Sequence, residues 1–373
     1  MIGESQQQAF DEMEVRVFRD PPAGYVAEIS MTDARESCEI RNLPPKSVAS
    51  EADMRSYGIQ LFEWLFPDKL LHLFRSARWS TEMYSRSAGP VSGVRFRLWL
   101  EPQATDLHSV WWEALHDPAR DEPLTLDMPF SRFMRVNAPR GWPISERPLR
   151  MLIATSNPEG LGEFGLTNID VALERELVSK ATSSVRRSLD VDKPTGAATL
   201  DNLRRQLESG YHIIHVLAHA TLVNGQGCLI LEGVDGKATG VPFDEVAKVI
   251  AHSSREAPYF VFLATPMTAS DQVGETLVRL APMLIEAGVQ AVVAVQAPMD
   301  NHKLWLFIER FYNVLIRTGV IDMAMAEART RIYSPEQWEW AFPVLYMRTP
   351  DAQLFHPLPE SLEATVRGIS TSD

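Results

Sequence analysis

The stretch FVFLATPMTAS, residues 260–270, decides how the whole chain is interpreted. Its first five residues are apolar without polar alternation, which is typical of a strand buried on both faces of a parallel sheet. The run is interrupted at Pro266, which has no backbone N–H to offer to a neighbouring strand. Because open α/β sheets place their chemistry at the carboxyl ends of strands, the residues after this strand are the first candidates for a functional site.

Short apolar runs of the same kind recur through the second half of the chain and alternate with amphipathic segments. The runs expected to be strands are 149–155, 212–218, 228–232, 259–265, 291–297 and 342–347. The segments expected to be helices are 170–179, a segment that begins near Thr199, and 242–252, 272–287, 303–318 and 322–332. This alternation predicts an α/β fold in which helices cover both faces of a mostly parallel sheet.

The first part of the chain has a different organisation. Residues 13–31 contain two alternating runs around DPPAG, which predicts a β-hairpin. Helices are expected from Ser50 onward, and VSGVRFRLWLEP (91–102) predicts a strand. The segment GWPISERP (141–148) combines two prolines, a glycine and charged residues, which is typical of a linker. The expected divisions are an N-terminal α+β region over 1–142, a core over 149–358 and a flexible tail over 359–373.

The composition argues against several classes of function. The 373 residues are 45% hydrophobic with a net charge of −13, and no run of Lys or Arg offers a surface for nucleic acid or an anionic membrane. The most membrane-like segment, residues 281–295, carries Glu286 and is shorter than the roughly 20 apolar residues that span a bilayer. The N-terminus lacks a secretory pattern and two cysteines build no disulfide framework, so we expect a cytoplasmic protein. We expect no cofactor and no metal, and the sequence leaves the oligomeric state open.

Six segments, taken together in their order and spacing, resemble one known family. They are YGIQLFEWLFPDKLL (57–71), VWWEALHDPARDEPLTL (110–126), YHIIHVLAHATL (211–222), VFLATPMTA (261–269), AGVQAVVAVQAPMDN (287–301) and FIERFYNVL (307–315). These segments are similar to those of the CHAT domain family, whose members are caspase-like peptidases related to separases and caspases. The resemblance implies the caspase-like form of the α/β fold, with the N-terminal region packed on the CHAT core.

In that family a histidine and a cysteine at the ends of adjacent strands form a catalytic dyad, in which the thiolate attacks a peptide carbonyl. The resemblance places the histidine at His219 and the cysteine position at Pro266, because the segment around Pro266 overlays the family's A-C-Q-T-A. Proline supplies neither a nucleophile nor a backbone N–H for the oxyanion. The glycine that follows the histidine in the family is Ala220 here, and its methyl group is expected to obstruct the approach of a peptide backbone.

The resemblance therefore implies a pseudo-peptidase that acts as a non-cleaving regulatory or binding subunit, with His219 as a vestigial dyad position. The expected partner is a protein, either an active caspase-like protease or its effector. The setting that the family implies is a bacterial signalling or defence system linked to proteolysis.

Two other interpretations stay open. A hydroxyl group near the proline, from Thr268 or Ser270, could replace the thiol and use His219 as its base, which would make the chain an active peptidase. Alternatively, the chain is a structural module without a functional cleft. Burial of the edge around His219 by the chain's own side chains would favour this last interpretation.

The remaining reactive side chains are expected to be structural. His212 and His215 lie on one predicted strand and point to opposite faces of it, which weakens any metal-site interpretation. Cys228 is expected to be a small core residue. Cys38 is expected in a loop or at the surface.

Overall fold

The structure, a computed structural model, describes residues 9–21, 24–32, 34–41, 51–87, 91–101, 104–137, 141–192, 196–264 and 279–358. The chain divides into two compact units. The first comprises Met1–Phe133 and Pro335–Ala341, and the second comprises Met134–Ser334 and Phe342–Asp373. The boundaries expected from the sequence, 1–142 and 149–358, stay predictions, and the expected tail over 359–373 lies outside the described residues.

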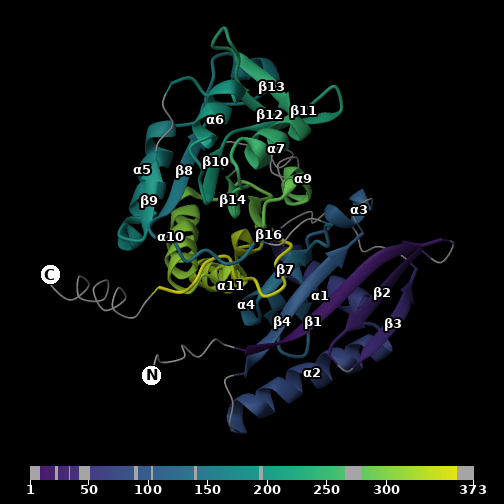
Figure 1. The fold of residues 1–373 in the computed structure, drawn as a ribbon. Coiled ribbons are helices and arrows are strands. Elements are labelled where there is room, and N and C mark those ends of the chain that lie inside the picture. Colours follow the sequence, from purple (N-terminus) through teal and green to yellow (C-terminus); the bar gives the residue numbers. More distant parts are fainter. Residues whose placement is uncertain are drawn as a thin grey trace, which may run out of the picture. The chain divides into compact units, whose positions relative to one another are not determined.

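The first unit contains strands and helices in mixed order (Figure 1). Its elements are β1 (Ala9–Asp20), β2 (Gly24–Ser30), β3 (Arg35–Ile40), α1 (Glu51–Leu65), α2 (Asp68–Ser87), β4 (Val91–Leu100), α3 (Thr105–His108), η1 (Trp112–Ala114), β5 (His116–Asp117), β6 (Glu122–Pro123), α4 (Leu124–Asp127), β7 (Phe130–Phe133) and η4 (Glu339–Ala341).

The sheet strands of the first unit lie in the order β3-β2-β1-β4-β7. β1 and β2 are antiparallel, which confirms the predicted hairpin, and β4 runs parallel to both β1 and β7. Helix α2 packs against β2, β3 and β4. The sequence did not predict β3, because RESCEI alternates charged with small residues and contains no apolar run.

A buried ion pair anchors the segment that begins at η1. Glu113 is fully buried, and its carboxylate accepts hydrogen bonds from the Arg132 guanidinium at 3.0 and 2.6 Å. Arg132 also donates to the carbonyl oxygens of His108 and Val110, at 2.9 and 3.1 Å. Every nitrogen of this guanidinium has an acceptor, which is the condition under which a buried charge is tolerated.

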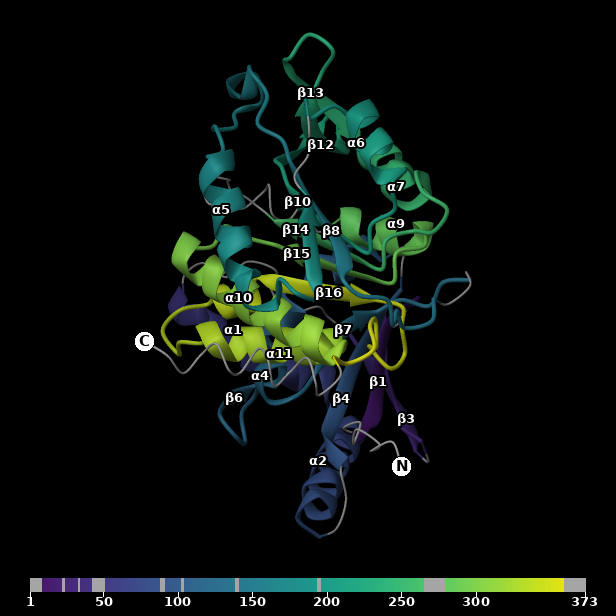
Figure 2. The ribbon, with the colours of Figure 1, turned by 60° about the vertical axis from the view of Figure 1, so that its left-hand side comes forward.

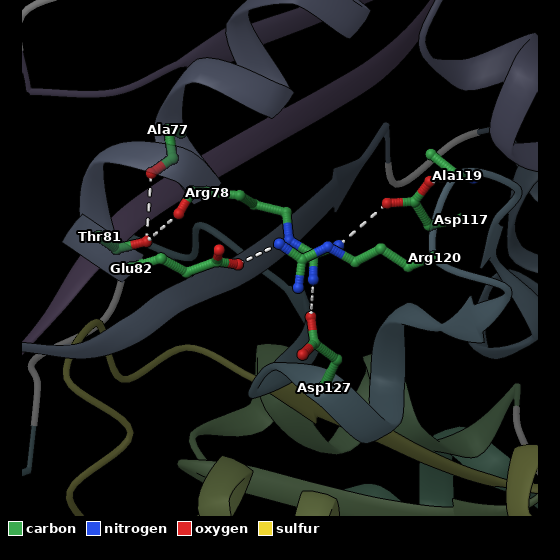
Figure 3. Close-up of polar contacts among 8 residues, drawn as sticks. All are labelled: Ala77, Arg78, Thr81, Glu82, Asp117, Ala119, Arg120 and Asp127. Atoms are coloured by element: carbon green, nitrogen blue, oxygen red, sulfur yellow. Dashed lines mark hydrogen bonds and ion pairs between the residues drawn. The ribbon is translucent and has the colours of Figure 1, made fainter. Parts of the chain in front are cut away.

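A second buried arginine joins α2 to the same segment (Figure 3). Arg78 donates to Asp117 at 3.1 Å and also forms an ion pair with Asp127. Both acidic residues of WEALHD (112–117), Glu113 and Asp117, therefore neutralise buried arginines. This explains in physical terms why the segment carries acids between apolar residues.

The second unit alternates strands with helices through most of its length. Its elements are β8 (Leu149–Thr155), η2 (Leu161–Phe164), α5 (Val171–Ala181), η3 (Ser183–Val185), β9 (Leu189–Asp192), α6 (Leu200–Leu207), β10 (Ile213–Leu217), β11 (Ala220–Val223), β12 (Gln226–Glu232), β13 (Ala238–Pro242), α7 (Phe243–His252), β14 (Phe260–Ala264), α9 (Leu280–Ala287), β15 (Ala291–Val295), α10 (Asn301–Thr318), α11 (Ile321–Ile332) and β16 (Pro343–Met347).

The main strands of the second unit lie in the order β9-β8-β10-β14-β15-β16. The strands from β9 to β15 are parallel, and β16 is antiparallel to β15. Helices α6, α7 and α9 lie on one side of these strands, and α5 and α10 lie on the other (Figure 2). The predicted α/β fold, a mostly parallel sheet covered on both faces, is confirmed.

Alternate residues of β10 face the two helical layers. Ile214 and Val216 belong to an apolar cluster that also includes Val246 of α7 and Leu284 of α9. His215 faces the opposite layer. Because a shift of one residue would exchange these two sets, the apolar cluster fixes the register of the strand.

A separate antiparallel sheet follows β10 in the chain, with the order β11-β12-β13 (Figure 1). β11 and β12 are joined by Asn224 and Gly225, whose φ angles are +51° and +80°. Two positive φ angles define the type I′ turn, which Asn-Gly favours. β12 was predicted from CLILE, whereas the short β11 and β13 were not. Among the described helices, none combines the length and the apolar character needed to cross a membrane.

Candidate functional site

The carboxyl ends of three neighbouring strands are level in the second unit. In the parallel register, Leu217 of β10 pairs with Thr155 of β8 on one side and with Ala264 of β14 on the other. In the sequence, His219 follows Leu217 by the same two residues by which Pro266 follows Ala264. Any group placed after these strands would therefore stand at one common edge, the usual position of functional groups in such sheets.

The structure describes some of the predicted site residues and leaves others out. Pro266, Thr268 and Ser270 lie outside the described residues, so their roles stay predictions. His219 and Ala220 are described, and they follow β10 directly.

His219 is buried, with only 1% of its surface exposed. Its Nε2 lies 2.7 Å from the carbonyl oxygen of Thr167. Because a carbonyl oxygen only accepts, Nε2 carries the proton and Nδ1 is the basic nitrogen of the neutral ring. Nδ1 is buried and has no hydrogen-bond partner in the part of the chain that the structure describes. Burial lowers the pKa of His219, and the bond to Thr167 opposes this shift, so the neutral ring dominates at pH 7.

Ala220 is the first residue of β11. Its side chain is fully buried and belongs to the apolar cluster together with Leu229 of β12. The methyl group therefore contributes to the core. Its predicted effect on an approaching peptide backbone stays a prediction.

Two further polar groups lie where β8 ends. The Thr155 hydroxyl accepts a hydrogen bond from Arg175 of α5 at 2.5 Å, while the Nε of Arg175 is buried without a partner within the described residues. The backbone N–H of Ser156 donates to the Leu217 carbonyl at 3.0 Å, which ties the end of β8 to the end of β10. The Ser156 hydroxyl is also buried, and the described part of the chain offers it no partner.

Three buried polar atoms at this edge thus have no partner among the described residues: His219 Nδ1, Ser156 Oγ and Arg175 Nε. Unpartnered buried polar atoms are costly and uncommon, and they gather where a protein binds a ligand or carries out chemistry. Such atoms also occur elsewhere in both units, and we take this edge as the candidate site because these three lie where the level strands end. Sequence reasoning identified only the histidine, because Ser156 and Arg175 belong to no motif and their positions depend on the fold.

A cavity of about 30 Å³ borders the same edge on the side of α6. Ser156 and Ala218 line it together with Thr199 and Asn202 of the α6 N-terminus, and apolar side chains form most of the remainder. This volume holds about one or two water molecules.

His212, His215 and Cys228 of the second unit have the surroundings expected of structural residues. The Nδ1 of His215 lies 3.0 Å from the Tyr312 hydroxyl, and the ring stacks on Phe262. Burial lowers the pKa of His215 to about 3. His212 accepts a hydrogen bond from the Arg150 backbone N–H at 2.9 Å. Cys228 is buried in β12, and its pKa is raised chiefly by burial.

Cys38 of the first unit lies in β3 and is partly exposed, not in a loop. Within the described ranges, no three His, Cys, Asp or Glu side chains come together in a way that would hold a metal ion.

Comparisons with solved structures find only distant likenesses. The matched chain of the Saccharomyces cerevisiae separase–securin complex is 12% identical with a TM-score of 0.41, over 75% of this chain and 17% of that chain. The RgpB pro- and mature domain complex of Porphyromonas gingivalis is 11% identical with a TM-score of 0.40, over 76% and 70%. The Arg-specific cysteine proteinase gingipain R is 10% identical with a TM-score of 0.41, over 76% and 68%. Likenesses with TM-scores this low support no inference about this chain. This chain spans only 17% of the matched chain in the separase–securin complex.

The sequence comparison is more decisive. No curated protein matches the chain significantly. The family model of the CHAT domain matches residues 55–358, which is well over half of the chain and includes parts of both units. The resemblance identified in the sequence is confirmed, and the chain belongs to the CHAT domain family.

Proposed function

We propose that this chain is a CHAT protein without peptidase activity, which acts as a regulatory or binding subunit. The observation that carries the proposal is the strand register. His219 follows Leu217 by two residues, and Leu217 pairs with Ala264. The residue that follows Ala264 by the same count is Pro266, which cannot act as a nucleophile.

Proline affects two parts of the chemistry at once. It has no thiol to attack a carbonyl, and it has no backbone N–H to donate to the resulting oxyanion. The loss of one oxyanion donor alone typically raises the barrier by about 2.7–4 kcal/mol. His219 keeps a basic nitrogen, but a base without a nucleophile does not cleave a peptide bond.

Binding remains compatible with this edge. The atoms of His219, Ser156 and Arg175 that have no partner among the described residues are groups that a bound segment can satisfy. The partner proposed is a protein, either an active caspase-like protease or its effector, in a bacterial signalling or defence system. That setting rests on family membership and not on the geometry.

The test is a hydrolysis assay with a broad library of quenched fluorescent peptides. We expect the native chain to cleave no faster than His219→Ala, because neither protein carries a nucleophile at the strand end. Cleavage that depends on His219 would contradict the proposal. Folding of the variant is checked by its thermal unfolding.

A peptidase with a hydroxyl nucleophile is the second candidate, and the Nδ1 of His219, which has no partner within the described ranges, favours it. It requires that Thr268 or Ser270 reach this nitrogen. A fluorophosphonate probe would then label one of them, and His219→Ala would abolish the labelling. We expect no labelling in either protein.

A structural module without ligand is the third candidate, and the burial of His219 favours it. It predicts that the chain retains no peptide from any library. We expect retention instead, because burial of the ring leaves polar atoms of the edge without a partner in the part of the chain that the structure describes.

A further inference from the structure

The imidazole of His219 contacts a surface segment that lies outside the strands of the sheet. Residues 160–169, which we call the strap, lie between β8 and α5 in the chain (Figure 2). The carbonyl of Thr167, in the second half of the strap, accepts the hydrogen bond from His219 Nε2 at 2.7 Å. The ring nitrogen of His219 that carries the proton is therefore occupied by the strap.

Hydrogen bonds from fixed parts of the second unit hold the strap in place. The chain before it is joined to β13, because the Ala238 N–H donates to the Glu159 carbonyl at 2.6 Å. At its other end, the Ile169 N–H donates to the side-chain Oδ1 of Asn157 at 2.8 Å. The strap therefore starts at a fixed point, and the side chains of Asn157 and His219 hold its second half.

The apolar anchoring of the strap is shallow. Its buried apolar side chains are those of Leu161 and Ile169, which are 3% and 6% exposed. Neither belongs to the apolar cluster that β10 shares with α7 and α9, and more than half of the strap residues are exposed. Segments with few buried apolar contacts and an exposed backbone open locally while the rest of a protein stays folded.

We infer that the strap is an autoinhibitory contact, which closes over His219 in the free protein and opens locally before a partner reaches this edge of the sheet. In the closed state the Thr167 carbonyl occupies Nε2. In the open state both ring nitrogens of His219 can be reached from solvent. The inference rests on the proposed function only in what the opening serves, because the opening itself is a property of the free protein. It also explains how a buried histidine can belong to a binding edge.

The first variant that tests the inference is Asn157→Ala. It removes the acceptor of the Ile169 N–H and leaves the sequence of the strap and His219 unchanged. The strap should then open more often, because a bond that holds it closed is lost. Asn202→Ala is the matched control, since it removes the same kind of side chain from α6, where its Nδ2 donates to the Ala197 carbonyl at 2.8 Å.

The second variant, Gly165→Ala, strains the closed strap through the backbone alone. Gly165 has a φ angle of +69°, and a methyl group there would meet nothing within 4 Å beyond its chain neighbours. The left-handed region disfavours alanine, so the substitution raises the free energy of the closed conformation. Gly210→Ala is the matched control, because Gly210 has a φ angle of +73°, equally open surroundings and a position outside the strap.

The readout is the rate at which diethyl pyrocarbonate modifies His219, located by tandem mass spectrometry. His215 is the internal reference, since both rings are 1% exposed and His215 is held beside Tyr312 in the core. We expect each strap variant to speed the modification of His219 about five-fold, and neither control to change it. His215 should stay unmodified in all of these proteins.

Amide hydrogen exchange in the native chain tests the opening without a substitution. The Ile169 N–H should exchange through local opening, whereas the amides of β10, a strand with neighbours on both sides, should exchange only when the unit unfolds. We expect Ile169 to exchange at least about a hundred-fold faster than Val216. Equal protection of the two amides would overturn the inference, because the strap would then open only with the whole unit.

The outcomes separate the inference from the proposed function. Modification of His219 at the native rate in both strap variants would overturn the inference and leave the absence of peptidase activity standing. Modification of His219 and His215 at equal rates would also overturn it, because the opening would then be global. Faster modification of His219 alone would support the strap, and if the same variants gained a cleavage activity that depends on His219, the proposed function would be contradicted while the strap would stand.

Discussion

Two buried polar sites, one in each unit, differ in how completely their atoms are hydrogen-bonded. In the first unit, the buried guanidinium of Arg132 finds an acceptor for each of its nitrogens, two of them on Glu113. At the strand ends of the second unit, His219 satisfies one ring nitrogen and leaves the other without a partner among the described residues. The satisfied pair serves stability, whereas the edge at His219 keeps polar atoms without a partner among the described residues, which is what the proposed binding role requires.

The largest effect is expected when the satisfied pair is broken. Glu113→Ala leaves the charge of Arg132 buried without its carboxylate, which typically costs about 3–5 kcal/mol of unfolding free energy. Urea unfolding followed by tryptophan fluorescence measures the unfolding free energy of the first unit, because seven of the nine tryptophans belong to that unit.

The control is Glu82→Ala, which breaks the exposed ion pair of Glu82 with Arg120 in the same unit (Figure 3). Exposed pairs contribute at most about 1 kcal/mol. If both variants lost equally little stability, the buried pair would not have the structural role assigned to it. The double variant Glu113→Leu with Arg132→Met should recover most of the loss, since an apolar pair leaves no buried charge.

The second-largest effect is a loss of folding stability in acid, which we expect because each unit buries a neutral histidine. Burial lowers the pKa of His215 to about 3, and burial, followed by the charge of Arg132, lowers that of His108 to about 4. The unfolded chain titrates near pH 6.5, so this stability is complete above about pH 6.5 and is lost as the pH falls toward the folded values. As the pH falls from 6.5 to 5, each of these histidines should lower the free energy of unfolding by about 2 kcal/mol.

The check is the unfolding free energy as a function of pH for the native chain and for His215→Phe. The variant should lose stability less steeply below pH 6.5, whatever its stability at pH 7. Identical slopes would show that His215 does not remain neutral in the folded chain.

A smaller effect is expected from Tyr312→Phe. It removes the hydroxyl that lies 3.0 Å from His215 Nδ1 and leaves a buried nitrogen without a partner, which costs about 1–3 kcal/mol. Tyr259→Phe is the matched control, because its hydroxyl donates to the Trp142 carbonyl at 3.0 Å in an exposed position. Thermal unfolding should distinguish them, and a Tyr312→Phe protein as stable as the control would contradict the assigned hydrogen bond.

Much of the second unit could be predicted from the sequence. The strands β8, β10, β14 and β15 are runs dominated by apolar residues, and such runs are typical of parallel strands buried on both faces. β9 and β13 were missed, because LDVD and ATGVP carry no such run and form strands only through their neighbours. The same reason explains why β11 was missed.

The candidate site could be predicted only where a motif exists. His219 was identified by the resemblance of its segment to the family. Its partner is the backbone carbonyl of Thr167, 52 residues away, and a carbonyl leaves no trace in the sequence. The contact of Arg175 with Thr155 joins a helix to a strand end, so it also becomes visible only in the fold.

The central claim is that residue 266 occupies the position from which a nucleophile would face His219. The most direct measurement is the rate at which iodoacetamide alkylates Pro266→Cys, compared with the same cysteine in a His219→Ala background. An adjacent imidazole promotes thiolate formation, so we expect alkylation near pH 6 to be at least about ten-fold faster when His219 is present. Equal rates in the two backgrounds would place residue 266 away from the histidine and contradict the account.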